Sequence, residues 1–212
     1  MLPARLFLPL ALAVAACRGT PAATTPEADP ARPLGGFAGR RVILLPLQSI
    51  DDGAAWAAAY GGPDTLRRRM DDELEYVLTE RGLSARWILP RQLAQLTRRA
   101  GTYASDPRAL NVEALRRRRE YPRDESLPDP LASQLRSLVA FTDARWVLLP
   151  VEARIEPAAG PARLVVQLAM IDARGALVAW IGEVAGDTAS RPGPAPFASA
   201  AGRVADLIVP AP

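Results

Sequence analysis

Few side-chain types in this chain could carry chemistry. It has 212 residues, no histidine, and 26 basic residues that are all arginine. Without histidine there is no His-based triad, no His-ligated metal site and no imidazole acid–base catalyst. Without lysine there is no Schiff base and no phosphate-loop lysine. Carboxylate pairs remain, but their spacing does not indicate an acid–base pair, and the chain has no Gly-x-Ser-x-Gly motif for a serine nucleophile. We therefore expect that the protein is not an enzyme and binds no cofactor.

The densest acidic run, residues 71–75, lies on an expected helix and could hold a hard cation. Three arginines, at positions 67, 68 and 69, precede three of these acids by four residues each. Side chains at that spacing face each other on a helix, so each acid has an expected partner. The pattern therefore predicts a solvated, charge-laced helix face and no metal site.

A run of four arginines is the most prominent basic feature: Arg116, Arg117, Arg118 and Arg119. They are predicted to end a helix, where cations complement the helix dipole. The other interpretation is a contact surface for an anionic partner such as phospholipid head groups, cell-wall polymer or an acidic protein patch. The net charge of the chain is only +3, so we do not expect nucleic acid as a partner.

Residues 51–62 form a loop that carries Trp56 and Tyr60 among alanines. This loop follows the first expected strand, where α/β folds place ligands. One interpretation is an aromatic contact surface. The alternative, equally weighted, is a short helix that buries Trp56 in the core.

The N-terminal residues look like a targeting segment. Arg5 precedes an apolar run over residues 6–16, which is shorter than the roughly 20 residues of a membrane span and fits a signal-peptide core. Val-Ala-Ala at 14–16 followed by Cys17, the single cysteine of the chain, resembles a bacterial lipoprotein box. A lone cysteine also excludes an intrachain disulfide and a Cys-rich zinc site. An ordinary signal peptide with a chance cysteine is the alternative.

The lipoprotein box implies a diacylglyceryl group on Cys17, cleavage before that residue, and acylation of the new N-terminus by a chain such as palmitate. Several acyl chains anchor a protein firmly to a membrane. Arg18 stands where an aspartate would imply retention in the inner membrane. The resemblance therefore implies an envelope lipoprotein at the outer membrane, facing the periplasm.

Composition and periodicity divide the chain into a signal peptide (1–16), a lipidated cysteine with a disordered tether (17–39) and one domain (40–212). Apolar runs predict strands at 41–47, 85–89, 145–151, 163–171 and 176–184. Helical spacing predicts helices at 64–81 and 90–99, then from residues 106 and 129, and at 197–208. The order β-α-β-α-α-α-β-β-β-α indicates an α/β domain, borderline α+β, with helices packed on a single mixed sheet.

The order of these elements and four short motifs resemble a family of envelope domains. The motifs are Leu45-Pro46, Arg81-Gly82-Leu83, Thr142-Asp143-Ala144, and Ile171-Asp172-Ala173-Arg174-Gly175. The family includes the periplasmic domain of the curli-secretion channel lipoprotein, the amino-terminal domain of TolB, and the lipoprotein LpoB that activates a peptidoglycan synthase. Such domains bind proteins or build assemblies and are not enzymes. The chain departs from the family in a longer, arginine-rich stretch at 97–130 and in lacking membrane-inserting hairpins, so a secretion pore is not expected.

The sequence thus predicts a non-catalytic, lipid-anchored envelope protein. Its periplasmic domain would bind a protein partner or another copy of itself. One alternative is a structural subunit of an envelope export assembly, which would oligomerise without a partner. The other is a hydrolase that works without histidine.

Overall fold

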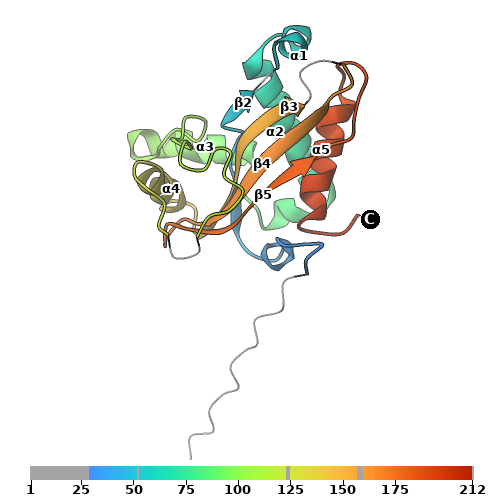
Figure 1. Cartoon of the computed structure of the whole chain (residues 1–212). Helices are drawn as coiled ribbons and strands as arrows, with labels where there is room; N and C mark the ends of the chain where they lie inside the picture. Colours follow the sequence, from blue (N-terminus) through green and yellow to red (C-terminus); the bar gives the residue numbers. More distant parts are fainter. Residues whose placement is uncertain (1–28, 52, 123–124, 157–159, 212) are drawn as a thin grey trace, which may run out of the picture.

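A computed structural model describes residues 29–212 except 52, 123–124, 157–159 and 212. Cys17 and the signal-peptide segment lie outside the described residues. The main elements surround one sheet (Figure 1). They are β1 (Val42–Leu44), β2 (Ser49–Asp51), α1 (Gly53–Tyr60), α2 (Pro63–Glu80), α3 (Pro90–Ala100), α4 (Leu131–Val139), β3 (Trp146–Glu156), β4 (Arg163–Asp172), β5 (Leu177–Ala185) and α5 (Ala195–Asp206). Short 3₁₀ helices η1 (Gly35–Phe37), η2 (Leu83–Ala85) and η3 (Gly101–Tyr103) complete them.

The sheet is mixed, with the order β1-β3-β4-β5 and with β2 also paired to β3. β1 and β2 run parallel to β3, whereas β3, β4 and β5 form antiparallel pairs. Pro46 separates β1 from β2 because proline has no N–H to donate to a ladder. The ladder resumes where the Gln48 N–H donates to the Pro150 carbonyl at 3.1 Å. The strand expected at 41–47 is therefore shortened to 42–44, and β2 follows beyond its expected end. The α/β fold with one mixed sheet is confirmed.

The central strand β3 carries an irregularity between Pro150 and Glu152, where its register with β4 shifts. Proline in a central strand cannot donate a ladder hydrogen bond, and such positions are found at bulges. After the shift Glu152 lies opposite Gln167 of β4.

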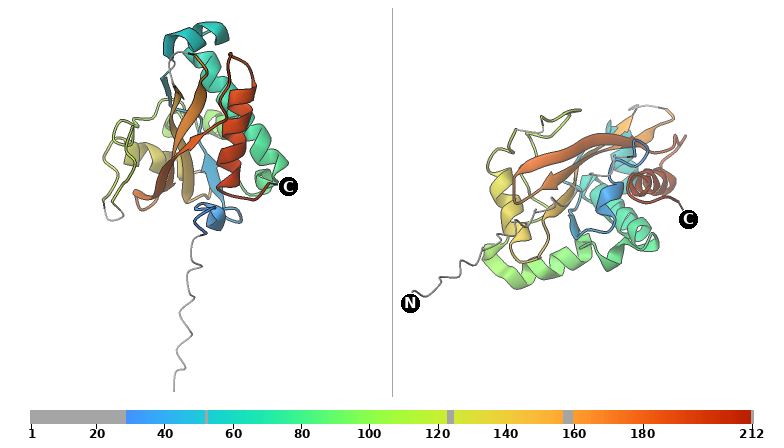
Figure 2. Two further views of the ribbon diagram at one scale, coloured as in Figure 1. Left: turned by 45° about the vertical axis from the view of Figure 1, so that its right-hand side comes forward. Right: turned by 90° about the horizontal axis from the view of Figure 1, so that it is seen from below.

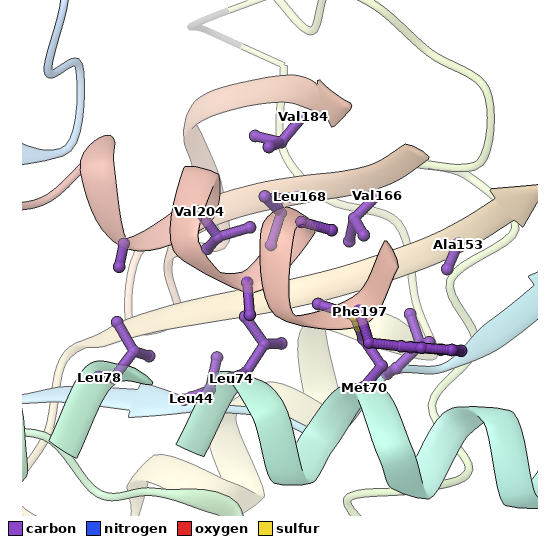
Figure 3. Packing of buried hydrophobic residues seen from close by; sticks show 14 of the residues in the cluster. Leu44, Met70, Leu74, Leu78, Ala153, Val166, Leu168, Val184, Phe197 and Val204 are labelled. Atoms are coloured by element: carbon purple, nitrogen blue, oxygen red, sulfur yellow. The ribbon is translucent and has the colours of Figure 1, made fainter. Parts of the chain in front are cut away.

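Two apolar cores lie on the two faces of the sheet. α2 and α5 cover one face, where Leu74 and Val204 meet strand residues such as Leu168 (Figure 3). α4 lies on the opposite side of the sheet (Figure 2), and its Leu135 joins the second core with Leu149 of β3. Neighbouring strand residues point to opposite faces. Continuous apolar runs therefore mark strands buried on both faces.

Two predicted elements are wrong, and one strand was not predicted. The helix expected from Asp106 is absent, and residues 106–122 and 125–128 form turns and extended chain. Its apolar residues are nevertheless buried, with Leu115 fully inaccessible. In the expected strand at 85–89, Ile88 alone pairs, through a parallel bridge to Ile43. β2, at residues 49–51, was not predicted: the expected strand ends at 47, and the expected loop begins at 51.

Packed chain begins before the boundary expected at residue 40. Leu34 is fully buried, and its N–H donates to the Leu207 carbonyl at 3.0 Å. The Phe37 ring packs edge-on against the Trp146 ring with centroids 4.9 Å apart. The last residues of the expected tether thus belong to the domain, and the chain enters it beside the first residue of β3.

Candidate functional site

A buried carboxylate lies at the centre of the arginine-rich region. Glu152, on β3, has no exposed surface. A buried charge needs a partner to offset its lost hydration. Arg116 supplies one: its Nε donates to Glu152 Oε1 at 3.0 Å, and its Nη2 donates to the same oxygen. This hydrogen bond raises the pKa of Arg116, so the guanidinium keeps its charge.

A second buried polar residue, Gln167 on β4, fixes the arginine-bearing turn. Its Nε2 donates to the carbonyls of Leu115 and Arg118 at 2.8 and 2.7 Å, and its Oε1 accepts the Arg117 N–H at 2.9 Å. Arg117 takes a left-handed conformation, with φ of 57°. No sequence pattern predicts Glu152 and Gln167 as site residues. The available signal was that Gln167 interrupts the apolar run 164–171 and that Glu152 directly follows the run 145–151.

An open hollow of about 350 Å³ lies above these groups. Arg117 Nη2 bonds Asp51 Oδ2 at 3.2 Å, and Arg154 Nη2 lies 3.1 Å from Glu183 Oε1. β2, β3, β5 and the arginine-bearing turn therefore meet here. We name this surface the distal hollow; its lining residues are Asp51, Arg117, Arg119, Arg154 and Glu183.

Two buried polar atoms of this cluster have no hydrogen-bond partner among the described residues. They are Glu152 Oε2 and Arg154 Nη1, which lie 3.9 Å apart. Arg117 Nε is 3.7 Å from the same Glu152 oxygen. Buried polar groups normally have partners. The cluster therefore retains capacity to bind a water molecule or a polar ligand.

The four arginines of the predicted patch do not act together. Arg116 faces inward to Glu152, while Arg117 and Arg119 line the distal hollow. Arg118 lies over the Tyr121 ring at 5.0 Å and pairs with Glu125 at 3.5 Å. The helix that they were expected to end does not form, because the strands bind this turn through buried polar side chains.

The loop at 51–62 does not present an aromatic surface. It contains α1, which buries Trp56 and Tyr60 to 6% and 9% exposure. The Tyr60 hydroxyl donates to the Gly193 carbonyl at 2.8 Å and accepts the Gly193 N–H at 2.6 Å. Its ring packs edge-on against Phe197 of α5. These contacts agree with the alternative interpretation, a helix that buries its aromatic residues, and correct the contact-surface interpretation.

The acidic run at 71–75 has partners, but different ones from those expected. Asp71 is buried and accepts the Leu47 N–H at 2.7 Å and Arg108 Nη1 at 2.8 Å. Burial raises the pKa of Asp71 to about 6, although both hydrogen bonds oppose this. Asp72 bonds Arg91 at 2.9 Å. Across the part of the chain that the structure describes, no group of three or more acidic, histidine or cysteine side chains could hold a metal ion.

Two of the family-like motifs form turns. Asp172 Oδ1 accepts the N–H groups of Arg174 and Gly175, both at 3.2 Å, and closes the β4–β5 turn. Burial raises the pKa of Asp172, but hydrogen bonds from Arg145 and these two N–H groups outweigh it, so the pKa lies below its ordinary value. Asp143, in the other motif, adopts φ of 52° just before β3. These residues shape one end of the sheet.

Within the described residues no helix is both long and apolar enough to cross a membrane. No protein-family model matches the chain, and no curated protein matches its sequence. One similar solved structure is the dodecamer of a single-residue variant of PelC from Paraburkholderia phytofirmans. The two chains are 12% identical with a TM-score of 0.38, over 81% of this chain and 91% of the PelC chain. A likeness at this level supports no conclusion about family, function or assembly.

Proposed function

We propose that this protein is a non-catalytic, lipid-anchored protein of the bacterial envelope whose domain binds a protein partner or a second copy of itself. The observation that carries the proposal is the position of the distal hollow, at the end of the sheet opposite to the point where the chain enters. An anchored domain would present this hollow away from the membrane.

The anchor rests on the sequence. Cys17 closes the apolar run of the signal peptide in a lipoprotein-box pattern, and eleven residues (18–28) separate it from the first described residue. Fully extended, eleven residues span about 36 Å. The domain would therefore stay near the membrane surface.

The position of the hollow follows from the strand register. The chain enters beside Trp146, at the start of β3, and Arg154 lies eight residues further along the same strand. At about 3.3 Å per residue, the two points are about 26 Å apart. A partner that reaches Arg154 would not need to displace the chain that leads to Cys17.

The lining suits an acidic protein surface. Three arginines and two carboxylates face the distal hollow. An arginine fork binds a carboxylate through two parallel hydrogen bonds, which adds directional specificity. The lining offers no hydroxyl, thiol or imidazole nucleophile, which favours binding over catalysis.

The anchor is tested by intact mass and membrane fractionation of the wild type beside Cys17→Ala. The expected wild-type chain begins at Cys17, carries added acyl mass and sediments with membranes, and the variant lacks that mass. An unlipidated mature chain in the soluble fraction would contradict the proposal.

Self-association is tested by light scattering of the purified protein. Oligomers without a partner would favour binding to itself, as a structural subunit of an envelope assembly does. A monomer would favour a separate partner, to be sought by cross-linking in the envelope.

A further inference from the structure

A second basic surface lies at the end of the sheet where the chain enters. Arginines from five separate segments meet there, and all of them are exposed. We name them the tether-end arginines: Arg40, Arg41, Arg86, Arg136, Arg145 and Arg174. None of them was predicted to be a site residue, because they are scattered along the sequence, although Arg174 belongs to one of the family-like motifs.

The strand ends bring these residues together. Val42 pairs with Trp146, so Arg41 and Arg145 precede neighbouring strands on the same side. The Ala173 N–H donates to the Arg145 carbonyl at 2.9 Å, which places the β4–β5 turn beside them. One surface hollow is lined by both Arg136 and Arg174. Another is lined by both Arg41 and Arg86.

Positive charge dominates this end. Among the tether-end arginines, Arg145 pairs with Asp172 at the β4–β5 turn. The other five form no salt bridge with another described residue. Asp143 lines the hollow with Arg136, and Asp172 pairs with Arg145. Two further acids near the entering chain, Asp29 and Asp206, pair with arginines outside this set, Arg32 and Arg81. The six arginines therefore exceed Asp143 and Asp172 by four charges.

Aromatic rings hold part of this charge in place. The Arg40 guanidinium lies 5.7 Å from the centroids of both the Phe37 and Trp146 rings. The Arg145 guanidinium lies 5.3 Å from Trp146. Such cation–π contacts fix the arginines beside the residues through which the chain enters the domain.

We infer that the tether-end arginines bind the head groups of anionic phospholipids in the membrane to which Cys17 is anchored. This inference rests on the proposed lipid anchor, because a chain of eleven residues keeps this end near the bilayer. Arginine binds phosphate oxygens through its planar fork. Basic residues at an anionic bilayer each strengthen binding several-fold. The domain would then rest on this end, with the distal hollow facing away from the lipid.

Vesicle co-sedimentation of the full-length Cys17→Ala chain tests the inference without the anchor. Vesicles of phosphatidylglycerol and phosphatidylcholine (3:7) are compared with phosphatidylcholine alone, which gives the contribution of the apolar residues 6–16. Phosphatidylglycerol should raise the partition coefficient about tenfold or more at low salt, and high salt should remove that gain.

Two charge-matched variants locate the effect. Replacing Arg40, Arg41, Arg86 and Arg174 by glutamine should abolish the gain from phosphatidylglycerol. Replacing four exposed arginines elsewhere by glutamine should preserve most of it; these are Arg68, Arg98, Arg99 and Arg163.

Equal losses in both variants would show that net charge alone acts, and would overturn the inference. So would equal binding of the Cys17→Ala chain to the two vesicle types. Failure of the proposed anchor gives a different result, because wild-type protein would then lack acyl mass whatever its charged surface binds.

Discussion

Replacing Asp71 by asparagine should stabilise the protein at neutral pH. The Asp71 carboxyl is 4% exposed, and burial raises its pKa from 3.8 to about 6. Between these two values the folded state binds a proton that the unfolded state has released. The contribution of Asp71 to stability is therefore greatest below pH 4 and falls as pH rises to about 6.

The magnitude follows from the change in pKa. One pH unit corresponds to about 1.4 kcal/mol, so ionising Asp71 lowers the free energy of unfolding by about 3 kcal/mol. Asparagine stays neutral and can still accept the Leu47 N–H through its amide oxygen. Arg108, half exposed, loses its partner at a cost below about 1 kcal/mol. The net gain for Asp71→Asn at pH 7 should be about 2 kcal/mol.

Urea unfolding of both proteins from pH 4 to pH 8 measures this difference. The variant should exceed the wild type at pH 7, and the difference should shrink as pH falls toward 4. Asp72→Asn, on the adjacent exposed residue, is the control and should follow the wild type. A variant less stable than wild type at pH 7, or a difference independent of pH, would refute the reasoning.

Three further predictions concern the other polar contacts. Arg116→Ala should lower the free energy of unfolding by about 3 kcal/mol because it leaves buried Glu152 without its main partner. The double variant Arg116→Met with Glu152→Gln should lose less stability, since no buried charge is left unpaired. Chemical denaturation measures both losses, and equal losses would contradict the role of the charge. Tyr60→Phe removes two hydrogen bonds to Gly193 and should lower the free energy of unfolding by about 1–2 kcal/mol. Thermal unfolding measures this loss, and an unchanged Tm would mean that these hydrogen bonds contribute nothing to stability. Arg119→Gln should reduce cross-linking to an acidic envelope partner several-fold at low salt and less at high salt; capture equal to wild type at low salt would remove Arg119 from the contact surface.

The fold class could be predicted because the buried strands have a distinctive composition. Runs such as 145–151 and 163–171 are apolar at nearly every position, as strands buried on both faces must be. The helix at 64–81 was equally visible, since Leu66, Met70 and Leu74 repeat at helical spacing and are buried. Local periodicity is sufficient to predict a helix or strand wherever that element packs through one regular stripe of apolar side chains.

The candidate site could not be predicted because its contacts are long-range. The segment after Asp106 has helical spacing of apolar residues, but Gln48 binds its backbone at Leu110 and Gln167 binds it at Arg117. These contacts come from residues 62 and 50 positions away along the chain. Periodicity reports which residues are buried and carries no information about distant partners that replace helical hydrogen bonds.

The irregularity at Pro150 has a consequence for how this chain could tolerate insertions and deletions. Before it, even-numbered Leu148 faces the α2–α5 core; after it, odd-numbered Ala153 and Ile155 do. The extra residue thus reverses the alternation and turns Glu152 to the opposite face, toward Arg116. Loss of the extra residue, Val151, would restore simple alternation and leave Glu152 opposite Gln167, on the face that it now occupies. Relatives without the extra residue should therefore carry the charged residue one position nearer to the start of the strand, still on the face of Arg116.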